Sequence, residues 1–197
     1  MPKVLLEMSM SLDGCVTGPD VGPDEPMGRG GERLHDWMFE GRSDAESERF
    51  LVEKLKDIGA VIVGRRMADL GIVHWGEDPA FHCPVFVVTN RPAETIEKAG
   101  GTSYTFVTGG IDEALARAHE AAGSADVMVG GGAEIARQYL RAGAIDELRL
   151  HLVPLILGGG TPLFDDGPTI GLRAIEVTAE PKVTHLTYEV ERSSAQR

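Results

Sequence analysis

The segment that most constrains the fold joins a short apolar run, residues 127–129, to three consecutive glycines at 130–132. A helical pattern follows the glycines directly and extends to about residue 142. Glycines at a turn from strand to helix permit positive φ angles and let a ligand approach the main chain closely. The free N–H groups of the first helical turn, at the positive end of the helix dipole, would face that ligand. The segment therefore predicts a phosphate site; the alternative is that the glycines only let the helix pack closely on the strand.

Apolar runs and helical patterns alternate along the rest of the chain, which is typical of α/β architecture. Strands are expected over 4–10, 60–63, 85–89, 104–107 and 127–129, and helices over 43–57, 111–122 and 133–142. Ser43 is expected to cap the first helix, because Glu46 completes a capping box. An extended run over 148–157 contains Pro154, which predicts an edge strand or a bulge.

The end of the chain predicts an antiparallel hairpin formed by residues 172–177 and 183–191. The expected fold is therefore a three-layer α/β/α domain with a mixed, mostly parallel central sheet and a C-terminal antiparallel hairpin. A single domain is expected over residues 1–192, because neither a linker nor an internal repeat interrupts it, and residues 193–197 are expected to fray.

Composition excludes several classes of protein. A net charge of −12 over 197 residues argues against a general nucleic-acid surface and against binding to anionic membranes. The two cysteines, Cys15 and Cys83, lie far apart and suggest neither a disulfide framework nor a zinc site. The histidines show no metal-ligand spacing, so no metal is expected. Since no leader or membrane-spanning run is recognisable, a cytoplasmic location is predicted.

Four of the expected strands end in loops suited to ligand binding. These loops are Asp13-Gly14, Gly64-Arg65-Arg66, Thr89-Asn90-Arg91 and the glycine triplet. The carboxyl ends of parallel strands share one rim of the sheet, where α/β proteins bind ligands. Two glycine-bearing helix starts together with arginines match a dinucleotide that carries a pyrophosphate and a 2′-phosphate, which favours NADPH over NADH. The alternative is that the arginines are ordinary solvated loop residues.

The motifs Ser-Leu-Asp-Gly at 11–14, Val-Ile-Val-Gly-Arg-Arg-Met at 61–67, Val-Val-Thr-Asn-Arg at 87–91 and Val-Met-Val-Gly-Gly-Gly-Ala-Glu-Ile at 127–135 resemble the dihydrofolate-reductase-like family. The run Pro-Leu-Ile-Leu-Gly-Gly-Gly-Thr-Pro-Leu-Phe at 154–164 is similar to the branch that contains the reductase domain of riboflavin biosynthesis. The resemblance covers nearly the whole chain. It implies the dihydrofolate-reductase-like fold and NADPH as the cofactor.

The resemblance also implies where the cofactor lies. Val16 and Thr17 would lie near the nicotinamide, and Gly64 and Arg65 would open a short helix that holds the 2′-phosphate and the pyrophosphate. The remaining cofactor residues implied on these loops are Arg66, Met67, Thr89, Asn90, Arg91, Gly130, Gly131, Gly132, Ala133, Glu134 and Ile135. In dihydrofolate reductases a threonine often stands at the position of Met67, but the backbone N–H groups of the turn remain.

The sequence says less about the residues that would bind the substrate, which accepts the hydride. Asp13 lies at the end of the first strand, where it would orient substrate, relay a proton or simply cap the turn. Trp37 would stack on a flat ring with His35 as a polar contact, unless Trp37 is a core aromatic residue. The irregular loop over residues 18–31, rich in glycine, proline and acidic residues, is expected to act as a lid.

The predicted function is an NADPH-dependent reductase that transfers hydride to a C=N or C=O group of a small, pterin-like or pyrimidine-like substrate. One alternative is an NADP(H)-binding sensory protein without turnover. Another is a riboflavin-pathway pyrimidine reductase or dihydrofolate reductase proper, although the riboflavin reductase typically has glutamate where this chain has Gly130. The resemblance favours a homodimer, in which the run 148–157 is either core or interface.

Overall fold

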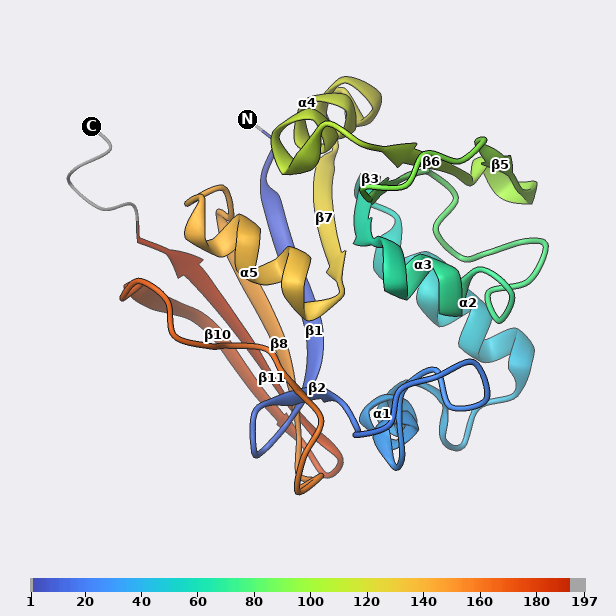
Figure 1. Cartoon of the computed structure of the whole chain (residues 1–197). Coiled ribbons are helices and arrows are strands. Elements are labelled where there is room, and N and C mark those ends of the chain that lie inside the picture. Colours follow the sequence, from blue (N-terminus) through green and yellow to red (C-terminus); the bar gives the residue numbers. More distant parts are fainter. Residues whose placement is uncertain (1, 192–197) are drawn as a thin grey trace.

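A nine-stranded mixed sheet runs through the computed structural model, which describes residues 2–191, and helices cover both of its faces (Figure 1). The strand order is β10-β11-β8-β1-β7-β3-β4-β6-β5. The strands are β1 (Val4–Ser11), β3 (Ile58–Gly64), β4 (Pro84–Val88), β5 (Ile96–Glu97), β6 (Ser103–Val107), β7 (Asp126–Gly131), β8 (Glu147–Val153), β10 (Leu172–Glu180) and β11 (Val183–Val190). A separate two-stranded sheet pairs β2 (Cys15–Thr17) with β9 (Thr161–Pro162).

The pairing confirms the predicted mixed, mostly parallel sheet. Strands β8, β1, β7, β3, β4 and β6 run parallel to one another. Strand β11 is antiparallel to β8, and β10 is antiparallel to β11, so the C-terminal hairpin is present as expected. Short strand β5 is antiparallel to β6 and ends the sheet.

Side chains alternate between two cores on opposite faces of the sheet. One core contains Leu6 and Ile62 and continues into α4 (Gly110–Ala122) and α5 (Ala133–Arg141). The other contains Leu5 and Val61 and continues into α2 (Asp44–Leu55) and α3 (Arg65–Gly71). Burial on both faces explains why the parallel strands appear in the sequence as nearly continuous apolar runs.

The start of α2 is determined locally, as the sequence predicts. Ser43 precedes the helix, and its backbone N–H donates to Glu46 Oε2 at 2.8 Å. The expected helix over 43–57 is slightly too long, because α2 ends at Leu55 and β3 begins at Ile58. Between the 18–30 loop and α2, the chain forms a 3-10 turn, η1 (Gly31–His35), and the short helix α1 (Asp36–Phe39), neither of which the sequence predicted. A second 3-10 turn, η2 (Ala99–Gly101), precedes β6.

The predicted edge strand or bulge at Pro154 is wrong. Strand β8 is an interior strand between β1 and β11, and it ends at Val153, before the proline. An interior strand needs N–H donors on both sides, which proline lacks. The chain turns away after β8, and Leu155 O accepts from Leu12 N at 2.8 Å. The bulge in this part of the sheet lies instead in β10, between Ala174 and Glu176.

Within residues 2–191, no second folding unit lies beside the sheet. The domain limits at residues 1 and 192 stay a prediction. The tail expected to fray, residues 193–197, lies outside the described part of the chain. Over residues 2–191, no helix is long and apolar enough to span a membrane.

Deletion of a buried leucine side chain in β1 should destabilise the fold. Leu6 is 0% exposed, whereas Leu12, just after the strand, is 62% exposed. We expect Leu6→Ala to lower the free energy of unfolding by about 2–5 kcal/mol, because it leaves a cavity. The matched variant Leu12→Ala should change it by less than about 0.5 kcal/mol. Urea denaturation followed by circular dichroism measures both, and equal effects would contradict the assigned core.

Candidate functional site

The predicted ligand loops meet at one rim of the sheet. Strands β1 and β7 both run downwards in Figure 1 and are hydrogen-bonded neighbours, so their carboxyl ends share the lower edge. Strands β3 and β4 follow in parallel, and their ends at Gly64 and Val88 lie on the same edge. The loops after these four strands therefore come together, as the sequence predicts.

The turns at Gly64 and at the glycine triplet pack directly against each other. A Cβ on Gly64 would lie 2.9 Å from Ile135 Cγ1 on α5. Gly131 has φ of 123°, and a Cβ there would lie 3.2 Å from both the Met8 and the Met67 side chains. Gly64 and Gly131 are therefore needed for packing, which for Gly131 was the alternative interpretation of the glycine triplet.

Gly132 differs from its neighbours because it faces open space. It is the N-cap of α5, and a Cβ built on it would have no heavy atom within 4 Å. The peptide bond between Gly131 and Gly132 is cis. The backbone at the start of α5 is thus accessible to a ligand, as a phosphate site requires.

Arg65 and Arg91 converge on an acidic residue that the sequence did not single out. Asp69 pairs with Arg65 Nε at 2.6 Å and with Arg91 Nη2 at 3.0 Å. Arg65 Nη1 also donates to the Arg91 carbonyl at 3.1 Å, and Thr89 Oγ1 accepts from Arg91 N at 3.0 Å. The Arg65 guanidinium lies 4.8 Å from the centre of the Phe106 ring. Two positive side chains are therefore held together at the rim.

Arg66 and Asn90 do not join this pair. Arg66 Nη2 donates to Val21 O at 3.0 Å and thereby ties the 18–30 loop to α3. The loop is also closed on itself, because Gly18 N donates to Met27 O at 2.8 Å. Asn90 is exposed and lies between Thr89 and Arg91 in the chain.

The other residues implied for the cofactor follow β1 and β7. Val16 is buried, and the Thr17 hydroxyl donates to Thr161 Oγ1 at 2.9 Å across the β2–β9 pair. On α5, Ala133 is buried, whereas exposed Glu134 accepts from Gln138 Nε2 at 3.0 Å and Arg137 Nη2 at 3.1 Å. These hydrogen bonds, the one from Gln138 first, hold the pKa of Glu134 below its ordinary value.

Asp13 anchors the loop that follows β8. Its carboxylate accepts from Ser11 Oγ at 2.6 Å, Leu157 N at 3.1 Å and Gly158 N at 2.8 Å. These hydrogen bonds, the one from Ser11 first, hold the pKa of Asp13 below its ordinary value. An ionised carboxylate with these donors fits the capping role better than the role of proton donor.

Trp37 lies over histidines rather than in an empty slot. Its indole N–H donates to Ser9 Oγ at 3.2 Å, and its ring centre lies 4.7 Å from that of His151 and 4.9 Å from that of His185. Burial, followed by the nearby His151, lowers the pKa of His35 to about 4, so His35 is neutral at physiological pH. The sequence reasoning missed these two histidines because its only test for them was metal-ligand spacing.

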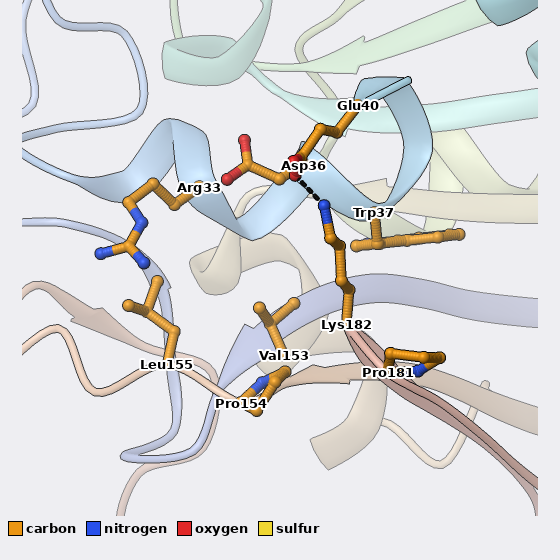
Figure 2. A pocket seen from close by; sticks show the side chains of 9 residues that line it. All are labelled: Arg33, Asp36, Trp37, Glu40, Val153, Pro154, Leu155, Pro181 and Lys182. Atoms are coloured by element: carbon orange, nitrogen blue, oxygen red, sulfur yellow. Dashed lines mark ion pairs between the residues drawn. The ribbon is translucent and has the colours of Figure 1, made fainter. Parts of the chain in front are cut away.

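A pocket of about 190 Å³ opens beside Trp37 (Figure 2). The η1–α1 segment contributes charged side chains, among them Arg33 and Asp36, on one side. The end of β8 and the β10–β11 turn form the other side, and Lys182 of that turn pairs with Glu40. Among residues 2–191, no cluster of three or more His, Cys, Asp and Glu side chains has the geometry of a metal site.

The strand order and the rim define the dihydrofolate-reductase-like fold. Dihydrofolate reductase from Enterococcus faecalis, complexed with NADP(H), is 14% identical and superposes with a TM-score of 0.60 over 96% of this chain and 97% of that one. A pyrimidine reductase-like protein from Corynebacterium diphtheriae is 17% identical, with a TM-score of 0.61 over 98% and 93%.

Within this fold the chain belongs to the RibD C-terminal domain family, whose sequence profile matches residues 2–186. The uncharacterized protein YwjB of Bacillus subtilis is 27% identical over 166 residues, which is 83% of each chain. The resemblance expected from the motifs is thus confirmed at the level of fold and family.

The pKa of Asp13 should depend on Ser11. NMR titration of the Asp13 carboxyl carbon should give a pKa below the ordinary aspartate value. Ser11→Ala should raise it, because that variant removes the largest stabilising hydrogen bond of the carboxylate. Ser103→Ala, in distant β6, is the control and should leave it unchanged. An unshifted Asp13 in the unmodified chain would contradict the anchoring role.

Proposed function

We propose that the protein is an NADPH-dependent reductase that transfers hydride to a C=N or C=O group of a small, pterin-like or pyrimidine-like heterocycle. The observation that carries the proposal is the open backbone turn at Gly132 beside the paired Arg65 and Arg91. When bound, NADPH supplies the hydride from its nicotinamide ring, and the protein binds, orients and shields the reactants.

The start of α5 suits the pyrophosphate. The helix has nine residues, and the N–H groups of its first turn follow the uncrowded Gly132. Glu134 lies in this first turn, but its carboxylate is held by Arg137 and Gln138. The acidic side chain therefore leaves the helix start to the ligand.

The arginine pair suits the 2′-phosphate. Asp69 holds Arg65 and Arg91 close together, and a phosphate with two negative charges would compete for the same guanidinium groups. Thr89 fixes the turn that carries Arg91. These contacts support a preference for NADPH over NADH.

The acceptor side is proposed to lie between Thr17, the 18–30 loop and Trp37. Arg66 tethers the loop through Val21, so the loop can cover the reactants only together with α3 or after this contact breaks. Membership in the RibD C-terminal domain family and the likeness to a pyrimidine reductase-like protein support a pyrimidine-type acceptor. A 5-amino-6-(5-phosphoribosylamino)uracil reductase and dihydrofolate reductase proper are the specific alternatives.

Fluorescence titration with NADPH and NADH tests the cofactor assignment. We expect micromolar NADPH binding and much weaker NADH binding. Arg65→Ala should weaken NADPH binding by roughly 10- to 100-fold, which is the effect of losing a charge-assisted hydrogen bond. It should change NADH binding little. The control Arg117→Ala removes an arginine paired with Glu113 at 2.6 Å on α4, and should change neither. Equal weakening of both nucleotides by Arg65→Ala would refute the 2′-phosphate role.

Stopped-flow absorbance separates a reductase from a sensory protein that only binds NADP(H). We expect loss of the nicotinamide absorbance when 5-amino-6-(5-phosphoribosylamino)uracil, 7,8-dihydropterin or 7,8-dihydrofolate is mixed with the NADPH complex. Tight NADPH binding without oxidation by any of the three would favour the sensory alternative.

A homodimer is proposed through β10. Every residue of this edge strand is exposed, and three of its apolar side chains, Leu172, Ile175 and Val177, are 41%, 50% and 60% exposed. Leu148 and Leu150, from the run in which the sequence left core and interface open, are buried in the core. The interface is therefore assigned to the neighbouring hairpin instead of that run.

Sedimentation equilibrium tests the dimer. We expect a mass near twice 21.1 kDa at micromolar concentration. Val177→Glu should give a monomer, because it places a charge in the apolar interface. Val73→Glu, at a position 82% exposed on the other side of the sheet, should leave the dimer intact. A monomer in the unmodified chain would end this proposal.

A further inference from the structure

Four titratable side chains form one connected cluster on the sheet face covered by α1 and α2. Glu7 comes from β1, Lys54 from α2, His151 from β8 and His185 from β11. We refer to these four residues as the relay cluster. Their side chains are 11%, 24%, 9% and 24% exposed, respectively. Neither the cofactor rim nor the fold requires charged groups at this depth.

The contacts of the relay cluster run in a line from α2 to the molecular surface. Lys54 Nζ pairs with Glu7 and lies 3.3 Å from His151 Nε2, which is itself 3.0 Å from Glu7 Oε1. His151 Nδ1 lies 2.8 Å from His185 Nδ1. His185 Nε2 then lies 3.8 Å from Oε1 of Glu180, a residue whose side chain is 58% exposed.

Two tautomeric arrangements satisfy the histidine pair. In the first, His151 carries its proton on Nε2 and accepts at Nδ1 from His185, whose Nε2 is then free toward Glu180. In the second, His151 Nε2 accepts from Lys54, His151 Nδ1 donates to His185, and His185 Nε2 carries a proton. A change from the first arrangement to the second moves one proton from the surface side to Lys54.

Burial and the surrounding charges keep Lys54 and the two histidines in different protonation states at neutral pH. Burial, followed by the charge of Arg149, lowers the pKa of Lys54 to about 8, so Lys54 is still protonated at neutral pH. Burial, followed by the charge of Lys54, lowers the pKa of His151 to about 3. Burial also lowers the pKa of His185, against the opposing carboxylates of Glu180 and Glu176. The histidines are therefore neutral and can transfer protons along their hydrogen bonds.

Further groups face the relay cluster from neighbouring elements. Arg149 Nη1 lies 3.7 Å from Glu7 Oε2. His151 is close enough to His35 to lower the pKa of His35, after the larger effect of burial. The indole of Trp37 covers both histidines, and Lys54 Nζ lies 5.9 Å from the centre of its ring.

The relay cluster lies close to the rim. Ser9 pairs with His151 across β1 and β8, and the next residues on the same face, Ser11 and Val153, end the two strands. Lys54 Nζ lies 5.9 Å from the centre of the Trp37 ring, so an acceptor that enters from the rim and contacts the edge of this ring would lie beside Lys54.

We propose that Lys54 donates the proton that accompanies hydride transfer and that His185 and His151 deliver a replacement proton from solvent. The inference rests on the proposed reductase function. Bound NADPH would supply the hydride for the acceptor carbon and leave as NADP⁺, and the C=N or C=O nitrogen or oxygen would take its proton from the Lys54 ammonium. Lys54 then takes the proton of His151 Nε2, His151 Nδ1 takes that of His185 Nδ1, and His185 Nε2 takes one from water. Glu7 and Trp37 position Lys54 and the histidines.

Two variants of Lys54 distinguish the loss of its transferable proton from the loss of its positive charge. Lys54→Met removes both, and Lys54→Arg keeps a charge that cannot be given up as a proton. The single-turnover reactions use NADPH and whichever of 5-amino-6-(5-phosphoribosylamino)uracil, 7,8-dihydropterin and 7,8-dihydrofolate is reduced. Both variants should slow hydride transfer by about 100-fold or more. The rate for the unmodified chain should fall above about pH 8, where Lys54 loses its proton, and this limb should vanish in both variants. Lys98→Met is the matched control, because Lys98 is 12% exposed and pairs with Glu77 far from the relay cluster.

His185→Phe tests the replacement path. It should leave the first turnover unchanged, because Lys54 already holds its proton, and lower the steady-state rate. Trp37 would still be covered by an aromatic ring in this variant, so a purely structural role predicts no such difference between the two rates. If His185→Phe and the unmodified chain had equal rates both in the first turnover and in the steady state, the relay would be overturned.

The outcomes distinguish this inference from the proposed function. Absence of NADPH binding would defeat the proposed function. Normal NADPH binding and acceptor reduction in Lys54→Met would defeat the inference alone. In the ligand-free chain, heteronuclear NMR of the imidazole nitrogens should show His151 and His185 neutral, with complementary tautomers that change in Lys54→Met. A charged His151 at neutral pH, or tautomers that cannot hydrogen-bond to each other, would overturn the inference even without an acceptor.

Discussion

The close packing of two glycine turns is the contact on which the ligand rim depends. A Cβ on Gly64 would lie 2.9 Å from Ile135, and one on Gly131 would touch two methionines. Because both positions lack a Cβ, the start of α3 can lie against the start of α5. This brings Gly64, which directly precedes Arg65, close to the open backbone at Gly132, although 68 positions separate the two glycines in the numbering of the chain.

The rim also depends on loops that are fixed by single polar side chains. Asp13 holds the chain after β8 through Leu157 and Gly158, and Arg66 holds the 18–30 loop through Val21. Loops carry many of the functional residues of α/β proteins, and such anchors place them with little regular structure. Asp13 thus contributes to the site by holding a neighbouring loop in position.

The buried relay cluster has an energetic cost that packing alone does not explain. Moving Lys54 and Glu7 out of water is unfavourable, and an apolar pair of similar volume would often be as stable. The cluster is nonetheless completed by His151, His185 and the covering Trp37. Polar groups retained at this cost beside a ligand rim, with perturbed pKa values, are typical of functional sites.

The sequence by itself determined the α/β class, the order of the main elements, the start of α2 and the loops that form the rim. These features follow from local causes: the period of apolar residues, the Ser43–Glu46 capping box, and glycines at the ends of strands. Only the tertiary structure decided that β8 is interior, that Asp69 joins two arginines, and that Lys54 meets Glu7 and His151. The physical reason is distance along the chain, because Glu7 lies 47 positions from Lys54 and 144 from His151. No local pattern links residues that only strand pairing and helix packing bring together.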